Sequence, residues 1–144
     1  MSDLVVRPAQ AGDRSGVWEL AREFATTFTP VRADFDRSFD CLIGDPAARL
    51  VVAVAASGQL VGYLLAHRHL TFLANGPVAW VEEVMVDAAV RRAGVGRVLM
   101  AHAEDWARAG GAAYVALATR RAGAFYRALG YEESAAFYRK LLTP

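Results

Sequence analysis

The fold of this chain is decided by residues 84–96, which read Val84-Met85-Val86-Asp87-Ala88-Ala89-Val90-Arg91-Arg92-Ala93-Gly94-Val95-Gly96. An apolar strand ends in an acid, a short loop follows, and two glycines open a helix. The free N–H groups of a helix's first turn bind anions, and glycine lets an anion approach the backbone without a Cβ in the way. Two arginines just upstream add positive charge. The stretch therefore predicts a site for a phosphorylated ligand.

The helix that begins at Gly94 has one apolar face, made at helical spacing by Val95, Val98, Leu99, His102 and Trp106. We expect His102 to be packed and hydrogen-bonded on this face. The strands expected before and after the helix span residues 78–86 and 114–118. A strand, a helix and a second strand in this order predict a right-handed parallel crossover.

The rest of the chain adds elements on both sides of this crossover. Upstream we expect a strand at 4–7, a helix capped by Asp13 whose apolar face extends to Phe28, a helix at 33–43, and a hairpin of strands 50–56 and 60–69. Downstream we expect a helix at 122–129 and a weak final strand, Phe137 to Leu142. The order is β-α-α-β-β-β-α-β-α-β. This mixed α/β layout has no linker or repeat, so we expect one domain over residues 1–144.

Composition counts against several classes of function. The chain has 144 residues with 16 basic and 15 acidic side chains, and a net charge of +1 gives no support for nucleic-acid binding. No apolar run is long enough to span a membrane and no secretory signal is recognisable, so a cytoplasmic protein is expected. Cys41, the one cysteine, allows no intrachain disulfide, and its apolar neighbours favour a buried position.

Two common glycine motifs do not fit residues 91–96. A dinucleotide fold needs G-x-G-x-x-G directly after its first strand, and a P-loop needs G-K-[ST]. The segment instead resembles the acyl-CoA-binding motif [Arg/Gln]-x-x-Gly-x-[Gly/Ala] of the GNAT superfamily of N-acetyltransferases, with Arg91, Gly94 and Gly96 at its defined positions. On this motif alone, a glycine-rich helix start with solvated arginines remains the alternative.

A second signature extends the resemblance. Residues 122–131, Ala-Gly-Ala-Phe-Tyr-Arg-Ala-Leu-Gly-Tyr, are similar to the family's A-x-x-F-Y-x-x-x-G-[F/Y] pattern. The family's fold has the same element order, with a mixed central sheet that splays between its fourth and fifth strands to admit the pantetheine arm. Here those strands would be 78–86 and 114–118.

The resemblance implies that acetyl-CoA is the donor and that no metal takes part. It places the donor against Val84, Met85, Val86, Arg91, Arg92, Ala93, Gly94, Val95, Gly96, Arg97, Thr119, Phe125 and Tyr126. A backbone N–H near Met85 would polarise the thioester carbonyl. Thr119 stands where many members have asparagine, which puts that contact in doubt.

The resemblance also implies an acid and a base. Tyr126 would protonate the leaving thiolate, the alternative being a packing tyrosine beside Phe125. Glu82 and Glu83 are costly to bury in an apolar strand, so at least one should face a polar space, and alternation should point them to opposite faces. Acidic pairs of small-amine members favour the first acid, Glu82, as base, with Glu83 left open.

The acceptor is expected to be a small-molecule amine or a peptide amino group, bound near Phe28, Tyr63, His67 and Trp80. Dimers are common in the family, so a homodimer is a further expectation. His67 and His69 have a spacing that zinc can use, but no neighbour completes the ligand set, and no metal site is predicted.

Two other functions remain to be distinguished. A catalytically silent acyl-CoA-binding or sensing module would have the same fold, although the paired acids and the Phe125-Tyr126 signature favour catalysis. A toxin-like acetyltransferase of charged transfer RNA would need a basic face, and the net charge of +1 counts against it. The identity of the acceptor is not given by these residues, since one fold serves many substrates.

Overall fold

The computed structural model of the chain describes residues 3–24 and 27–143. Its strands are β1 (Val5–Pro8), β2 (Ala48–Val54), β3 (Leu60–Thr71), β4 (Gly76–Val86) and β5 (Val115–Leu117). Its α-helices are α1 (Arg14–Phe24), α2 (Arg32–Ile43), α3 (Val95–Ala109) and α4 (Gly123–Ala128), and short 3-10 helices span Ala11–Asp13 and Ala88–Val90. In the described residues, no helix combines the length and the apolar character that crossing a bilayer requires.

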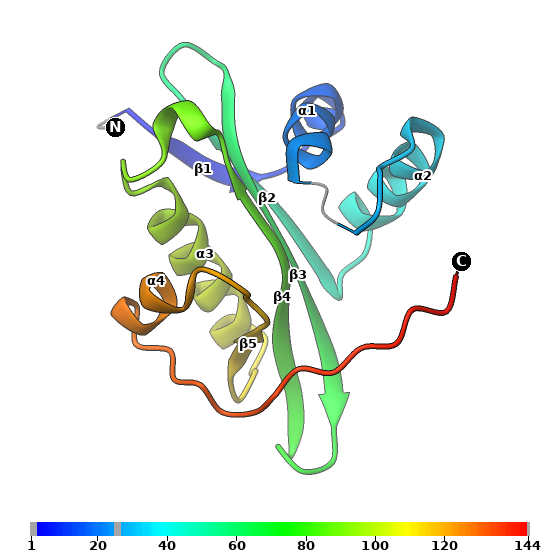
Figure 1. Cartoon of the computed structure of the whole chain (residues 1–144), viewed down its shortest axis with the longest axis vertical. Coiled ribbons are helices and arrows are strands. Elements are labelled where there is room, and N and C mark those ends of the chain that lie inside the picture. The colour runs from blue at the N-terminus through cyan, green and yellow to red at the C-terminus, as the bar shows by residue number, and fades with distance from the viewer. Residues whose placement is uncertain (1–2, 25–26, 144) are drawn as a thin grey trace.

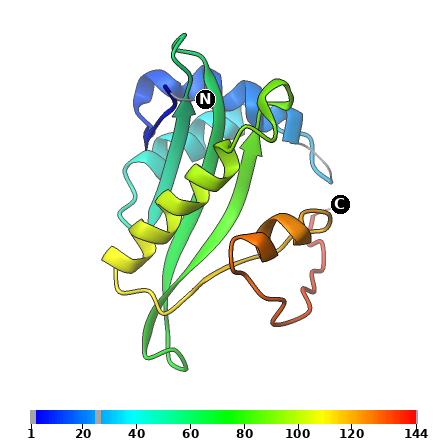
Figure 2. The same cartoon turned by 90° about the vertical axis from the view of Figure 1, so that its left-hand side faces the viewer.

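The strands form one sheet in the order β1-β2-β3-β4-β5, antiparallel up to β4 and parallel between β4 and β5. Helices α1 and α2 cover one face of this sheet, and α3 covers the other (Figures 1 and 2). The parallel pair is joined through α3, as expected for the crossover. The mixed α/β fold with a splayed sheet is therefore confirmed.

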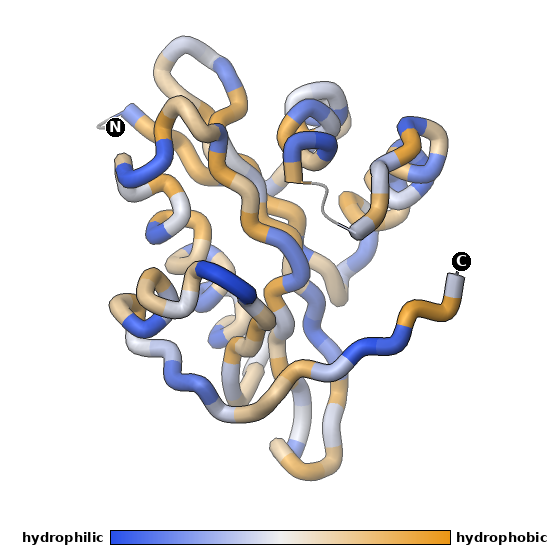
Figure 3. Tube along the Cα trace, in the orientation of Figure 1, coloured by the Kyte–Doolittle hydropathy of each residue, from blue (hydrophilic) through white to orange (hydrophobic). Residues whose placement is uncertain are grey.

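Each face of the sheet has its own apolar core, and Figure 3 shows apolar residues along the central strands. The core under α3 contains ten fully buried residues: Val51, Ala53, Val61, Leu64, Ala66, Val81, Val95, Leu99, Met100 and Ala103. The core under α1 and α2 is made by Val17, Leu20, Phe39, Leu50, Val52, Tyr63, Leu65 and Met85. The strands of the middle of the sheet are apolar on both faces because each face is covered by helices.

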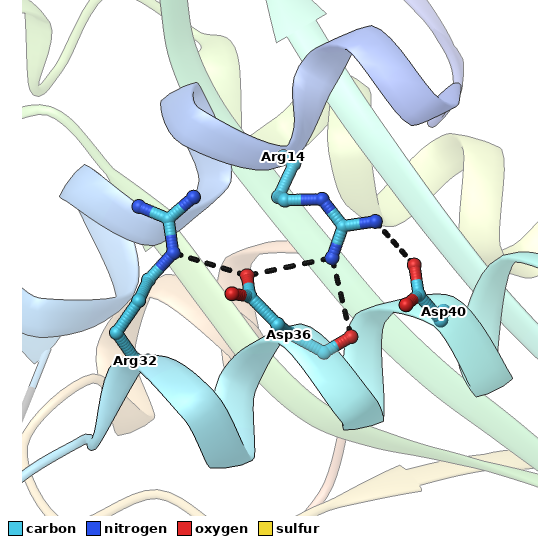
Figure 4. Close-up of polar contacts among 4 residues, drawn as sticks. All are labelled: Arg14, Arg32, Asp36 and Asp40. Carbon is cyan, nitrogen blue, oxygen red and sulfur yellow. Dashed lines mark hydrogen bonds and ion pairs between the residues drawn. The ribbon is translucent and has the colours of Figure 1, made fainter.

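An ion-pair network fastens α1 to α2 (Figure 4). The Arg14 guanidinium donates to the backbone carbonyl of Asp36 at 3.2 Å and pairs with the carboxylates of Asp36 and Asp40. Arg32 donates from Nε to the same Asp36 Oδ1 at 3.0 Å. Arg14 thus reaches from α1 to two turns of α2, which sets the position of α2 relative to α1.

The sheet opens between β4 and β5. The two strands are paired only where Ala79, Trp80 and Val81 face Val115, Ala116 and Leu117. β5 then ends, whereas β4 continues to Val86 with β3 as its one ladder partner. We call Glu82–Val86 the open segment of β4. Its backbone groups on the β5 side have no strand to pair with, so they are available to another partner.

A β-bulge lies where the open segment begins. Glu83 is opposite Leu65 of β3 and Val81 is opposite Ala66, so Glu82 is an extra residue in β4. Trp80 is opposite His67, two residues along β3 from Leu65. Trp80 and Glu83 therefore share the face covered by α1 and α2, although residues three apart in a regular strand point to opposite faces. The simple alternation expected for the two acids does not apply at a bulge.

The expected final strand, Phe137–Leu142, is wrong. Residues 131–143 form no helix or strand and make a C-terminal arm that crosses to the α1–α2 side of the sheet (Figure 1). Phe137 packs against Trp80, and Arg139 donates to Thr27 Oγ1 at 2.9 Å. These contacts hold the arm away from the edge of β5, and a strand needs a neighbour to pair with along its length.

Two helical expectations also need correction. α1 ends at Phe24, so Phe28 lies beyond it in a bend; residues 25 and 26 lie outside the described part. Cys41 is exposed, not buried. It lies two residues after the buried Phe39, about 200° around α2, and so on the side away from the sheet.

His102 is confirmed as a packed, hydrogen-bonded residue of α3. It is half-buried, and Arg49 donates to its Nε2 from Nη2 at 3.1 Å and from Nε at 3.3 Å. Burial and the Arg49 charge lower the pKa of His102, which keeps the ring neutral and able to accept these bonds.

Candidate active site

The start of α3 has the geometry of an anion site. Gly94 precedes the helix in the left-handed conformation at φ +87°, which glycine adopts without strain. Val98 donates to the Gly94 carbonyl at 3.2 Å, whereas the N–H groups of Val95, Gly96 and Arg97 have no backbone acceptor in the described part of the chain. Three donors that point out of a helix start fit an anionic group.

Gly96 serves a second purpose. A Cβ on Gly96 would lie 3.2 Å from Cζ of Phe125 in α4, which is tighter than ordinary packing. The absence of a side chain therefore lets α4 sit on the first turn of α3. The two motifs recognised separately in the sequence are in contact here.

The arginines of the motif surround this helix start. Arg91 donates from Nε to the carbonyl of Val86 at 3.3 Å, which ties it to the end of β4. Arg92 adopts a left-handed φ of +68°, and Arg91, Arg92 and Arg97 are all exposed, as is Ala93 between them and the helix. Guanidinium groups and free N–H donors together suit a diphosphate. A hollow of about 220 Å³ runs on between α3 and α4, lined by Arg97, Met100, Ala101, Glu104, Ala128 and Leu129.

Tyr126 in α4 packs on the α3 side of the sheet. Its ring meets Phe125 edge-on at 4.9 Å and Tyr131 at 5.9 Å, and Tyr131 donates to Glu104 at 2.7 Å. Tyr126, Val84 and Val86 pack against the same apolar core. Burial raises the pKa of Tyr126, so its hydroxyl is protonated at neutral pH. No protein partner for that hydroxyl is found among the described residues.

Glu83, within the open segment, lies on the opposite face of the sheet from Tyr126. The Tyr63 hydroxyl donates to Glu83 Oε1 at 2.6 Å, a length typical of a bond to a charged carboxylate. Tyr63 is 2% exposed, and burial followed by the nearby Glu83 charge raises its pKa far above neutrality. Tyr63 therefore stays protonated and donates its hydroxyl proton to the Glu83 carboxylate. Glu83 is half-buried, whereas Glu82 in the bulge is exposed.

The open segment thus has the protonated Tyr126 hydroxyl on the α3 side of the sheet and the Glu83 carboxylate, hydrogen-bonded by Tyr63, on the α1–α2 side. Val84 and Val86 face the α3 side together with Tyr126. Met85 is buried in the core on the Glu83 side. A group lying along the unpaired edge of β4 would pass between Tyr126 and Glu83.

The residues expected to bind the acceptor do not all lie together. Trp80 is half-buried and stacks on Phe137 at 6.4 Å with 26° between the ring planes, and His67 is opposite Trp80 on β3. Phe28 is 58% exposed and adjoins Thr27, which accepts the bond from Arg139. Tyr63 is buried and is not itself available to an acceptor; its hydroxyl contacts Glu83, which is half-buried.

Thr119 has a local structural contact. Its Oγ1 accepts from the backbone N–H of Ala122 at 3.1 Å, at the turn that leads into α4. No group of three or more potential metal ligands gathers in residues 3–24 and 27–143.

Sequence reasoning missed two features of this site. The bulge at Glu82 had a signal, because two adjacent acids in an apolar strand disturb its alternation. Nothing in the sequence indicated the contact between Phe137 and Trp80, because that contact depends on the path of the whole C-terminal arm.

Comparison with known proteins identifies one family. The model described as "Acetyltransferase (GNAT) family" matches residues 15–131. No curated protein matches significantly. Among solved structures, the chain is similar to a glucosamine-6-phosphate N-acetyltransferase from Arabidopsis thaliana, at 23% identity, TM-score 0.85, and 97% and 99% coverage of the two chains. It is also similar to a transcriptional regulator from Bacillus halodurans C-125, at 23% identity and a TM-score of 0.85, with 96% of this chain and 99% of the other covered. An aminoglycoside 6'-N-acetyltransferase from Acinetobacter haemolyticus has 22% identity and a TM-score of 0.77, with 96% of this chain and 99% of the other covered. At these identities the likeness shows the fold alone.

Proposed function

This chain belongs to the acetyltransferase (GNAT) family and is an acyltransferase, and from that premise we propose that it transfers an acetyl group from acetyl-CoA directly to a primary amine. The observation that carries the proposal is the open segment of β4, which contains Glu83, has Tyr126 on its other face, and leads to the anion site at α3. One extended donor molecule could therefore contact the anion site, the proposed base Glu83 and the proposed acid Tyr126 at the same time.

The start of α3 would hold the donor's diphosphate. The N–H groups of Val95, Gly96 and Arg97 donate to it, and Arg91 and Arg92 add charge. The unpaired edge of β4 would accept the amide-bearing arm beyond the end of β5, since no strand pairs with Glu82–Val86 on that side, although the Val86 carbonyl already accepts from Arg91 Nε. When bound, acetyl-CoA supplies a thioester whose carbonyl carbon the amine attacks.

Glu83 is our choice for the base. A primary amine is protonated near neutral pH and must lose a proton before it can attack. Glu83 has one oxygen held by Tyr63 and a second oxygen free of protein partners in the described residues. The resemblance favoured Glu82, but that side chain is exposed and has no such support.

Tyr126 is our choice for the acid. Its hydroxyl keeps its proton at neutral pH and is not engaged by the described protein groups. It lies on the face of β4 opposite Glu83, so the proton taken from the amine and the proton given to the leaving sulfur pass through different groups. Of the three ammonium protons, one stays on the amide nitrogen and one passes through Glu83 to solvent. The third is lost to solvent as the carbon–sulfur bond breaks, and Tyr126 regains from solvent the proton that it gave to the sulfur.

The acceptor class rests on the carboxylate. A single held carboxylate attracts a cation, and the two acetyltransferases with the same fold are named for amine-bearing substrates. A small-molecule amine or an exposed peptide amino group fits this chemistry.

Thiol release from acetyl-CoA, measured across a panel of primary amines, tests the proposal. We expect turnover with at least one amine, and Tyr126→Phe should lower it by about 10²–10⁴-fold while CoA still binds. Tight CoA binding with no turnover of any amine would instead favour a silent CoA-binding module.

A further inference from the structure

The bulge in β4 builds a strip of side chains on the face under α1 and α2. Along β4 the strip contains Met85, Glu83 and Trp80, and along β3 it contains their partners Tyr63, Leu65 and His67. Glu83 is the one carboxylate of these six. Neighbours on one face of a strand are roughly 7 Å apart, so Trp80 follows the base directly.

The C-terminal arm adds a second aromatic ring to this strip. Phe137 stacks on Trp80 at 6.4 Å and 26°, and the Arg139 bond to Thr27 anchors the arm beyond it. Phe137 is 62% exposed, so the stack presents apolar surface to solvent beside a carboxylate. An aromatic pair with one exposed ring next to a charged group is a suitable surface for an amphipathic ligand.

We propose that Trp80 and Phe137 bind the body of the acceptor, and that the acceptor is a primary amine on a flat, apolar body such as an aryl-alkylamine. This inference rests on the proposed function. The ammonium pairs with Glu83 and the ring packs on the aromatic pair. Leu65 and His67, the β3 partners of Glu83 and Trp80, have Cα atoms roughly 7 Å apart. We therefore expect a short linker, of about two or three carbons, between nitrogen and ring.

Other amines fit this strip less well. A polyamine binds more tightly where a second carboxylate pairs with its next nitrogen. The strip of β3 and β4 has no second carboxylate beside Trp80. A sugar amine gains from several hydrogen-bonding groups, whereas the surface beyond Glu83 is an aromatic pair next to one imidazole. Burying hydroxyl groups without partners costs binding energy.

Two substrate series test the inference. Benzylamine, phenethylamine and 3-phenylpropylamine vary the linker, and ethylamine, spermidine and glucosamine lack the ring. We expect kcat/KM to be highest for phenethylamine or 3-phenylpropylamine. The deciding quantity is the ratio of kcat/KM for phenethylamine to that for ethylamine.

Variants of the arm assign the preference to the stack. Phe137→Ala should lower the ratio by about 3- to 10-fold, from the usual energy of an aromatic contact, and Phe137→Leu should fall between. Tyr138→Ala is the matched control, because Tyr138 is the neighbouring aromatic of the same arm and is 88% exposed. Phe137 is largely exposed, so the Phe137→Ala variant should fold normally. The test therefore needs no substitution of the half-buried Trp80.

The outcomes separate the two proposals. A ratio that falls with Phe137→Ala and stays constant with Tyr138→Ala supports the inference. Turnover that is equal for both amines, better for spermidine or glucosamine, or insensitive to Phe137 overturns it and leaves the proposed function intact. Absence of turnover with every amine overturns the proposed function and this inference with it.

Discussion

Glu82 and Glu83 are adjacent in the sequence but differ in their surroundings. Glu83 is half-buried and accepts a bond of 2.6 Å from a buried tyrosine, whereas Glu82 is exposed in the bulge. Such a difference depends on the pairing of β4 with β3. The roles of the two acids are therefore decided by tertiary contacts and not by their local sequence.

The first prediction compares the two acids. Glu83→Gln should lower kcat by about 10²–10⁴-fold at neutral pH, because an amide cannot accept the amine proton. Glu82→Gln is the isosteric control and should change kcat by less than about 10-fold. Steady-state rates with one amine decide between them. The reverse order would return the base assignment to Glu82.

The second prediction concerns Tyr63 as a positioning residue for Glu83. Tyr63→Phe keeps the buried ring and removes the donor, and a hydrogen bond to a charged group contributes about 1.5–3 kcal/mol. We expect kcat to fall by about 10-fold or more. In a Glu83→Gln background the same change should have little effect on kcat, because the amide is no longer a base that Tyr63 could position. Additive losses in the double variant would show that Tyr63 acts only on the fold.

At the scale of elements, the start of α3 joins the two sequence motifs. Gly94 adopts a positive φ and Gly96 lets Phe125 approach. The third prediction is that Gly94→Val and Gly96→Val each weaken CoA binding by about 10- to 100-fold, since strain of this kind costs about 1–3 kcal/mol. Calorimetric titration with CoA measures the effect.

Gly44→Val is the control for these two variants. Gly44 follows α2 with a φ of −102° and open space around a Cβ, so valine should be tolerated there and CoA affinity retained. Unchanged affinity in both Gly94→Val and Gly96→Val would refute the anion site at α3.

Elements with strong periodicity were predictable from the sequence. The helix from Gly94 and the central strands follow from local apolar patterns, which helices on both faces of the sheet reinforce. The anion site could also be predicted from the sequence, since its N–H donors and its arginines all lie within residues 91–97. Phe137 was not, because the arm's path is set by Trp80 and Thr27, which are far away in sequence.

At the scale of the whole molecule, a partly buried ion pair connects the first strand to the first helices. Arg7 of β1 donates to Asp13 Oδ2 at 2.7 Å and Oδ1 at 3.0 Å, and the Gln10 N–H donates to Oδ2 at 2.7 Å. Asp13 is 6% exposed. The bond from Arg7, and then the one from Gln10, lowers the pKa of Asp13 below its usual value.

The fourth prediction is the pH dependence that follows. Because the pKa of Asp13 is lowered on folding, its contribution is complete above the unfolded pKa of about 4 and is lost as pH falls through the folded pKa. Asp13→Asn should reduce the free energy of unfolding by about 1–3 kcal/mol at pH 7. Denaturation between pH 2 and 7 should show the two proteins converging below pH 4. A gap that stays constant over this range would contradict the assignment.

The bulge at Glu82 and the end of the β4–β5 ladder fall at the same place, at Val81. A bulge bends its strand and increases the local twist, so the extra residue turns β4 away from β5. Removing one codon, that of Glu82, would leave Trp80 and Glu83 two positions apart, on the same face, with every pairing to β3 preserved. We therefore expect such a gene to encode a folded protein whose sheet is closed and which no longer takes up the donor. In engineering terms, we expect the deletion of one amino acid to convert the enzyme into a scaffold that binds no donor.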